Sequence, residues 1–127
     1  MRIGSDDNWV CIERVGPPDP ACVCRFTAAA AGAGWNFAAA GEQALVYVSN
    51  DNINDFADFN ALKIHQLELG LSDGGWLRIK RHIKGFIVVR YRATCRKLGA
   101  ALEGEIVLEG GAAKAFCNDF STLLCKQ

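Results

Sequence analysis

The feature that most constrains the fold is a long stretch, residues 63–109, in which apolar and polar side chains alternate with a period of two. The alternation comes in four runs, over 65–71, 77–84, 87–93 and 102–109, separated by short turn sequences. Such a pattern is typical of β-strands that bury one face and expose the other. Because consecutive strands joined by short turns pair with each other, the stretch predicts a four-stranded, strongly twisted antiparallel meander with one apolar and one charged face.

The first part of the chain predicts further strands. Residues 9–15 and 21–30 are rich in β-forming side chains and are joined by the turn sequence "GPPDP", which favours a hairpin. An aromatic strand start follows at Trp35 and Phe37, and residues 44–48, "ALVYV", read as a strong strand.

Two segments have helical spacing instead. The polar run "SNDN" offers N-cap residues, and the apolar residues that follow it predict a helix over about 51–63. After a Gly pair, Phe116, Phe120 and Leu123 form one apolar stripe, which predicts a second helix over about 112–125. With 127 residues the chain is long enough for one domain, residues 1–127, and we expect an α+β fold with both helices packed on the apolar face of the meander.

The charges are unevenly placed along this neutral chain. Residues 74–99 contain eight of the fourteen Lys and Arg residues and no acid, so the rest of the chain carries six bases and fourteen acids. A basic run of this kind forms either a nucleic-acid surface or the middle of a charged sheet face that acidic strands neutralise.

A strand register distinguishes these two interpretations. Matching the apolar faces at the last hairpin places Thr94 opposite Ala101, and it pairs two arginines with glutamates, Arg92 with Glu103 and Arg90 with Glu105. At the first hairpin we pair Leu71 with Leu77 and Leu69 with Ile79, which places Glu68 opposite Lys80. In the middle, Arg78 and Lys80 lie alongside Arg90 and Arg92. We therefore interpret the basic run as structural, neutralised by Glu68, Glu103, Glu105 and Glu109, and this disfavours nucleic acid as a partner.

The turn between the two basic strands is the part left unpaired in this register. It carries Arg81, His82 and Lys84, which we interpret as a contact for an acidic partner. Together with the neighbouring aromatic Trp76, the basic hairpin 78–92 alternatively forms a binding surface for a small ligand or a nucleic acid.

No arrangement of reactive side chains matches a metal or catalytic motif. The six cysteines, at positions 11, 22, 24, 95, 117 and 125, lack the paired spacing of zinc ligands. The histidines, His65 and His82, are far apart; His65 lies on the inward parity of its strand and is interpreted as structural. We expect six free thiols, no metal, no cofactor and no enzymatic activity.

Location and assembly follow from the distribution of apolar residues. The N-terminal segment has no apolar core of a secretory signal, and no apolar run approaches the ~20 residues of a membrane span, so we expect a cytoplasmic protein without membrane association. The strands around Trp9, Trp35 and Phe37 are apolar on both parities, which favours a homodimer. The alternative is that these strands form the inner layer of a thick sandwich.

The order of the predicted elements resembles that of a known group of domains. The segments that carry the resemblance are "INDFADFNAL" (53–62), "DGGWLRI" (73–79) and "LEGEIVLEGG" (102–111). In this order the chain resembles small bacterial domains of unknown function, of the immunity type or carried on mobile elements. The resemblance implies a bacterial, non-catalytic partner protein and transfers no functional residue to this sequence.

Overall fold

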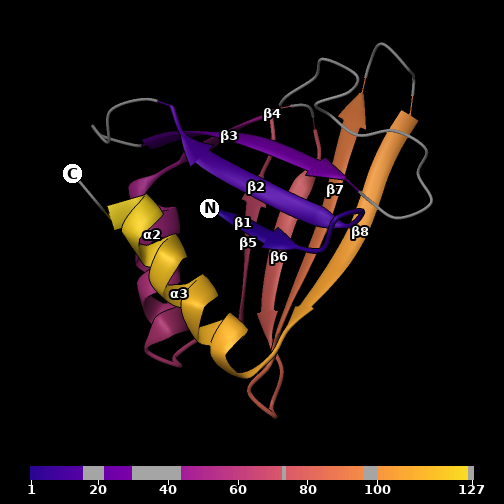
Figure 1. Ribbon diagram of the computed structural model, residues 1–127. Helices are drawn as coiled ribbons and strands as arrows, with labels where there is room; N and C mark the ends of the chain where they lie inside the picture. Colours follow the sequence, from indigo (N-terminus) through magenta and orange to yellow (C-terminus); the bar gives the residue numbers. More distant parts are fainter. Residues whose placement is uncertain (16–21, 30–43, 73, 96–99, 126–127) are drawn as a thin grey trace.

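The computed structural model describes residues 1–15, 22–29, 44–72, 74–95 and 100–125, which form two four-stranded antiparallel sheets and two helices, an α+β fold as predicted (Figure 1). In the first sheet the strands lie in the order β1 (Arg2–Gly4), β2 (Trp9–Arg14), β3 (Cys22–Ala29) and β4 (Ala44–Val48). In the second sheet the order is β5 (Gln66–Gly70), β6 (Trp76–Arg81), β7 (Ile87–Cys95) and β8 (Ala100–Leu108). The helices are α2 (Asn50–Asn60) and α3 (Gly110–Cys125). The predicted turn 16–20 and the strand start at Trp35 and Phe37 lie outside the described residues.

The second sheet is the predicted meander, and two layers cover its apolar face. Figure 1 shows the first sheet lying across it, with α2 and α3 beside each other at one side. Inward side chains of both sheets belong to one core, to which the helices contribute stacked and tilted phenyl rings: Phe56 lies 4.7 Å from Phe120, and Phe116 lies 5.4 Å from Phe120, between ring centroids. The inward residues of β2, β3 and β4 are therefore buried within the same chain, as the sandwich alternative requires.

Both ends of α2 have defined caps. Ser49 Oγ accepts the Asn52 N–H at 3.2 Å and Asn52 Oδ1 accepts the Ser49 N–H at 3.0 Å, a reciprocal capping box within the predicted "SNDN". At the other end, the Leu62 N–H donates to the Phe59 carbonyl at 3.2 Å and the Lys63 N–H to the Asp58 carbonyl at 2.8 Å. This is the Schellman arrangement, with Leu62 at the left-handed position, φ 63°. The helix therefore ends three residues before the predicted boundary.

The predicted register of the last hairpin is confirmed, since Thr94 pairs with Ala101, Arg92 with Glu103 and Arg90 with Glu105. The register of the first hairpin is wrong by two residues.

In that first hairpin, β5 and β6 pair Leu69 with Leu77 and Glu68 with Arg78, not with Lys80. A shift by two keeps every apolar side chain on the same face, so the hydrophobic pattern is the same in both registers. The turn decides between them. The Leu71 N–H donates to the Gly75 carbonyl at 2.9 Å, and Gly74, at φ 91°, donates to the Leu71 carbonyl at 3.0 Å. Leu71 thus belongs to the turn and not to the strand.

Beyond the ends of the strands, the alternation of apolar and polar residues no longer predicts which side chains are buried. Ile83, expected to point inward after Leu77 and Ile79, is 96% exposed because β6 ends at Arg81 and the chain turns there. The turn is closed by the His82 N–H, which donates to the Phe86 carbonyl at 2.8 Å. His65, expected on the inward parity, precedes β5 and is exposed. The prediction that these two side chains point inward is wrong for the same reason, because both residues lie outside the strands.

Tyr91 of β7 links the two sheets across the core. Its side chain is fully buried, and its hydroxyl lies 2.6 Å from Asn8 Oδ1 and 2.8 Å from the carbonyl oxygen of Ala29 at the end of β3. Asn8 also donates from Nδ2 to the Glu105 carbonyl at 3.0 Å, which ties the β1–β2 connection to β8. Burial raises the pKa of Tyr91 to about 12, because the phenolate form is poorly solvated there.

Candidate functional site

The outer face of the second sheet holds most of the basic run, and its charges are ordered in rows across the strands. One row runs Glu68, Arg78, Arg90 and Glu105 over β5, β6, β7 and β8. Each arginine pairs with the glutamate on its outer side: Arg78 Nε lies 3.3 Å from Glu68 Oε2, and Arg90 Nε lies 3.1 Å from Glu105 Oε2. The interpretation of the basic run as the neutralised middle of a charged face is confirmed for these residues.

The next row contains Trp76, one of the predicted binding residues. Trp76 is opposite Arg92, which forms an ion pair with Glu103. The Arg78 guanidinium lies over the Trp76 ring, 3.9 Å from its centroid, so one face of the indole is occupied from within the chain. Trp76 also begins β6, whereas Arg81 ends it. The structure therefore places Trp76 away from the three predicted residues of the turn.

Arg81, expected to be unpaired, is turned into the protein. Its Nη1 donates to the Phe59 carbonyl at 2.6 Å, its guanidinium lies 4.1 Å from the centroid of the Phe59 ring, and Nη2 lies 3.9 Å from Cys117 Sγ. The side chain is half-buried and fastens β6 to both helices. This corrects the expectation, because the carbonyl at the end of α2 offers an acceptor that the strand pattern alone does not reveal.

His82 and Lys84 remain at the turn, with different exposure. The His82 ring stacks on Phe86, 4.3 Å between centroids and 9° between planes, and its Nδ1 accepts the Lys84 N–H at 3.2 Å. His82 is therefore half-buried and supports the turn, and its contact with a partner stays a prediction. The side chain of Lys84 is exposed.

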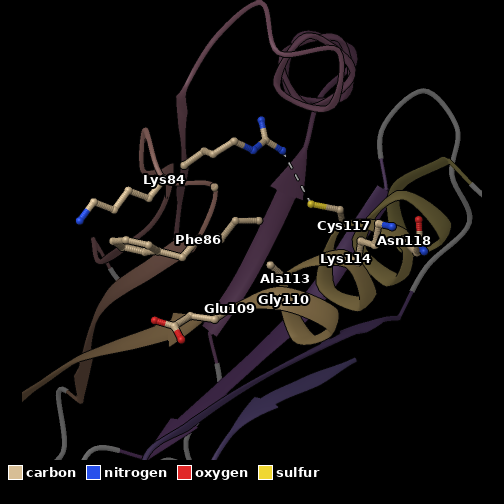
Figure 2. Close-up of a pocket in the computed structure, with 11 residues that line it drawn as sticks. Lys84, Phe86, Glu109, Gly110, Ala113, Lys114, Cys117 and Asn118 are labelled. Carbon is tan, nitrogen blue, oxygen red and sulfur yellow. Dashed lines mark hydrogen bonds between the residues drawn. The ribbon is translucent and has the colours of Figure 1, made fainter.

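A cavity of about 570 Å³ lies between this turn and the start of α3 (Figure 2), and we call it the hairpin–helix cleft. Its charged lining residues are three cations, Arg81, Lys84 and Lys114, and one acid, Glu109. Glu109, expected to neutralise the sheet face, instead lies beyond the end of β8 and lines this cleft. The remaining lining residues are Gly85, Phe86, Ile87, Gly110, Ala113, Cys117 and Asn118.

Sequence reasoning missed the contribution of α3 to this cleft. Lys114 and Cys117 are three residues apart, so they share one helix face, and that spacing is visible in the sequence. Nothing in the pattern indicates that this face lies opposite the β6–β7 turn, because the contact depends on how α3 returns after β8. Figure 2 shows the Cys117 thiol directed from α3 toward the hairpin side of the cleft.

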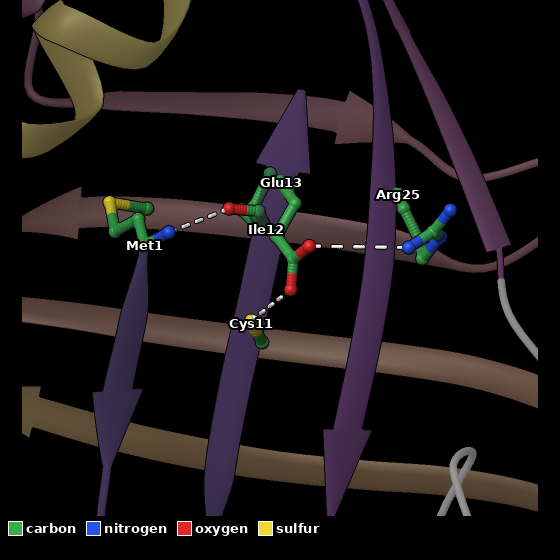
Figure 3. Close-up of polar contacts among 5 residues, drawn as sticks. All are labelled: Met1, Cys11, Ile12, Glu13 and Arg25. Atoms are coloured by element: carbon green, nitrogen blue, oxygen red, sulfur yellow. Dashed lines mark hydrogen bonds and ion pairs between the residues drawn. The ribbon is translucent and has the colours of Figure 1, made fainter. Parts of the chain in front are cut away.

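Three cysteines have described side chains, and two of them, Cys11 and Cys117, are free thiols. The third, Cys24, is buried on the inner face of the first sheet, whereas Cys11 lies on its outer face. Cys11 Sγ lies 3.4 Å from Glu13 Oε1, and Glu13 also approaches Arg25 at 4.0 Å (Figure 3). Burial, and then the neighbouring carboxylate, raise the pKa of the Cys11 thiol. Within the described ranges, no three His, Cys, Asp or Glu side chains are grouped to hold a metal ion.

Comparison with known proteins gives no match to a family model, to a curated protein or to a solved structure. Among the described residues, no helix has both the length and the apolar character needed to cross a membrane.

Proposed function

We propose that the protein is a non-catalytic binding protein that engages a partner protein through one end of the molecule. This end consists of Leu62, Lys63, Ile83 and Lys84, which we call the hairpin-end surface. The observation that carries the proposal is the 96% exposure of Ile83, a large aliphatic side chain at the tip of a turn and directly beside a lysine.

The two halves of the hairpin-end surface are held together by Arg81. Its backbone N–H donates to the His65 carbonyl at 2.7 Å, while its guanidinium binds the Phe59 carbonyl at 2.6 Å. The connection that carries Leu62 and Lys63 is thus bonded to the base of the β6–β7 turn at both of its ends. In Figure 1 the end of α2, the β6–β7 turn and the start of α3 lie at the same end of the molecule.

Leu62 supports the proposal because a leucine at this position lowers the stability of the fold. Its side chain is 62% exposed and its backbone lies at φ 63°, where glycine is favoured and leucine costs about 1 kcal/mol. Because the side chain is exposed, burial in the core does not offset the backbone strain. Burial against a partner would offset it.

The charge of this surface indicates the chemistry of the partner. Lys63 and Lys84 are exposed, and neither forms an ion pair within the described part of the chain. The matching surface therefore has an apolar pocket for Ile83 and acidic side chains at its rim. The resemblance in element order to immunity-type and mobile-element domains is the reason to seek this partner among proteins encoded beside this one.

The test is binding of the purified protein to the products of the flanking genes, measured by isothermal titration. We expect one of them to bind, and Ile83→Ser to weaken binding about tenfold or more. Val107→Ser is the matched control, because Val107 is also an exposed aliphatic residue, 49% exposed, on the outer face of β8. Equal affinities for wild type and Ile83→Ser, or an equal loss in the control, would contradict the proposal.

We also propose that the protein forms a symmetric dimer through the outer face of the first sheet. The residues on this face include Trp9, Cys11 and Leu45, which are half-buried, and Tyr47, which is 62% exposed. The same face carries Arg2, Glu13 and Arg25, but Glu13 and Arg25 approach each other at 4.0 Å and the Arg2 guanidinium lies over the Trp9 ring. Apolar side chains among charges that are partnered within the chain suit twofold pairing. The free thiols of Cys11 and Cys117 support a cytoplasmic location, since thiols stay reduced there.

A further inference from the structure

We propose that the hairpin–helix cleft binds a small organic carboxylate, with the carboxylate on Arg81 and an apolar body against Phe86. This site adjoins the hairpin-end surface and shares Lys84 with it, but its ligand lies in the cleft between the turn and α3, whereas Ile83, which carries the partner proposal, does not line the cleft. The proposal goes beyond the function given above and does not depend on it.

Arg81 is the first reason. Its guanidinium is half-buried, and within the described residues no carboxylate lies within ion-pair distance of it. One nitrogen is occupied by the Phe59 carbonyl, while Nη2 has, among the described residues, only the weak acceptor Cys117 Sγ, 3.9 Å away, at the wall of the cleft. A guanidinium has five N–H donors in a planar fork that matches a carboxylate, so donors remain for a ligand. A bound carboxylate would supply the counter-charge that this half-buried cation lacks.

The charge balance of the cleft favours an anion. Lys84 and Lys114 add two positive charges to that of Arg81, and Glu109 is the one acid among the described residues that line the cleft. This part of the lining therefore has three cations against one acid. A concave site of one sign concentrates ligands of the opposite sign.

The apolar part of the lining selects an organic ligand over a bare inorganic anion. Phe86, Ile87 and Ala113 line the cleft together with backbone at Gly85 and Gly110. Its volume of about 570 Å³ is within the range of pockets for small molecules. A ligand that combines one carboxylate with a small apolar or aromatic body fits both halves of this lining.

Cys117 provides a reporter of occupancy, because its thiol lies in the cleft and is half-buried and free. The experiment measures the alkylation rate of each native cysteine by iodoacetamide, mapped by mass spectrometry, with benzoate as the probe. At a benzoate concentration about ten times its Kd, we expect alkylation of Cys117 to slow about tenfold, since only the unliganded fraction reacts. Cys11, on the outer face of the first sheet and away from the cleft, is the internal control, and its own rate should be the same with and without benzoate, whether or not that face pairs in a dimer.

Two further probes define the ligand class. Benzamide has the same ring without the charge, and inorganic phosphate has the charge without the ring. Neither should protect Cys117 at concentrations where benzoate does. Protection by benzamide equal to that by benzoate would overturn the role of Arg81, and equal protection by phosphate would overturn the organic class.

Variants test the residues. Lys114→Glu reverses an exposed charge of the cleft and should weaken benzoate protection about tenfold. Lys80→Glu, the same change on the outer face of the second sheet, should leave it unchanged. Absence of benzoate protection in the folded wild-type protein overturns the proposal, whether or not a partner binds at Ile83.

Discussion

The ring of Tyr91 on β7 occupies the space where a side chain of Gly104, its paired residue on β8, would lie. A Cβ atom at Gly104 would be 2.8 Å from Tyr91 Cε1 and closer still to the hydroxyl. The absence of a side chain on β8 therefore allows the tyrosine to reach across the core to Asn8 and Ala29. The inward position of one strand is left empty so that its neighbour can join the two sheets.

This relationship predicts that Gly104→Ala is strongly destabilising. The new methyl group collides with a buried ring that is held at its hydroxyl, and overpacking of this kind costs about 1 to 3 kcal/mol. Gly70→Ala is the control, because Gly70 is also a strand glycine and a Cβ there meets nothing within 4 Å. Urea unfolding of both variants measures the difference. Similar stabilities for the two would show that the Tyr91 ring moves aside freely.

The raised pKa of Tyr91 predicts a loss of stability at alkaline pH. In the unfolded chain a tyrosine titrates near pH 10, whereas burial raises the pKa of Tyr91 to about 12. The folded state therefore binds the Tyr91 proton more tightly than the unfolded chain does. The resulting contribution to the free energy of unfolding is complete below about pH 10 and is lost as the pH rises toward 12. The fall amounts to about 2 to 3 kcal/mol. Tyr91→Phe should lack it, and parallel unfolding curves for the two proteins across this range would contradict the assignment.

The ion pairs of the outer face predict a measurable coupling between charge reversals. Arg90→Glu with Arg92→Glu places four acids side by side and should lower the free energy of unfolding. Adding Glu103→Lys and Glu105→Lys restores opposite charges and should recover part of the loss, about 0.2 to 1 kcal/mol for each pair. A double-mutant cycle measures this coupling energy. Because the side chains are 42% to 63% exposed, the coupling should decrease in high salt.

Leu62 predicts a separation of stability from binding. Leu62→Gly relieves the left-handed backbone and should raise the free energy of unfolding by about 1 kcal/mol. The same change removes an aliphatic side chain from the hairpin-end surface and should weaken partner binding. Ala61→Gly, at the neighbouring position with φ −80°, is the control and should destabilise the protein slightly. If the Leu62→Gly protein were less stable than wild type, the claim that Leu62 destabilises the fold through its left-handed backbone would be wrong.

The proposed dimer predicts a solution mass of twice 13.8 kDa by light scattering at micromolar concentration. Tyr47→Asp should convert it to the monomer, because a charge buried in this interface would be left unpaired. Ile83→Asp places the same charge on the hairpin-end surface, outside the proposed dimer interface, and should leave the dimer intact. A wild-type mass of one chain that does not change on concentration would rule out the dimer.

Much of the fold follows from local pattern. The register of β7 and β8 was predictable because the two strands alternate over 87–93 and 102–109 and two Arg–Glu pairs fix their alignment. The register of β5 and β6 was not, since a shift by two leaves every face unchanged and the backbone bonds of Leu71, Gly74 and Gly75 decide. The alternation itself carries no information on where a strand stops, which is why Ile83 was placed inside.

The candidate site was only partly predictable. The sequence indicated the turn residues His82 and Lys84, but Arg81 is held by a helix-end carbonyl and by contacts that depend on tertiary packing. Cys117 and Lys114 reach the cleft because α3 folds back beside the turn. Such a site is built from elements separated by tens of residues, and no local motif marks it.

The row Glu68, Arg78, Arg90 and Glu105 has a consequence for how charged molecules approach the protein. Its charges sum to zero and its two ion pairs point in opposite directions, so their dipoles oppose each other and a quadrupole remains. The field of a quadrupole decays faster with distance than that of a single charge, and salt screens it further. An anion several ångströms away is therefore not guided to this row. It is guided to cations that form no ion pair within the described part of the chain, namely Lys80 on the same face and Lys84 and Lys114 at the rim, where Glu109 offsets part of their charge.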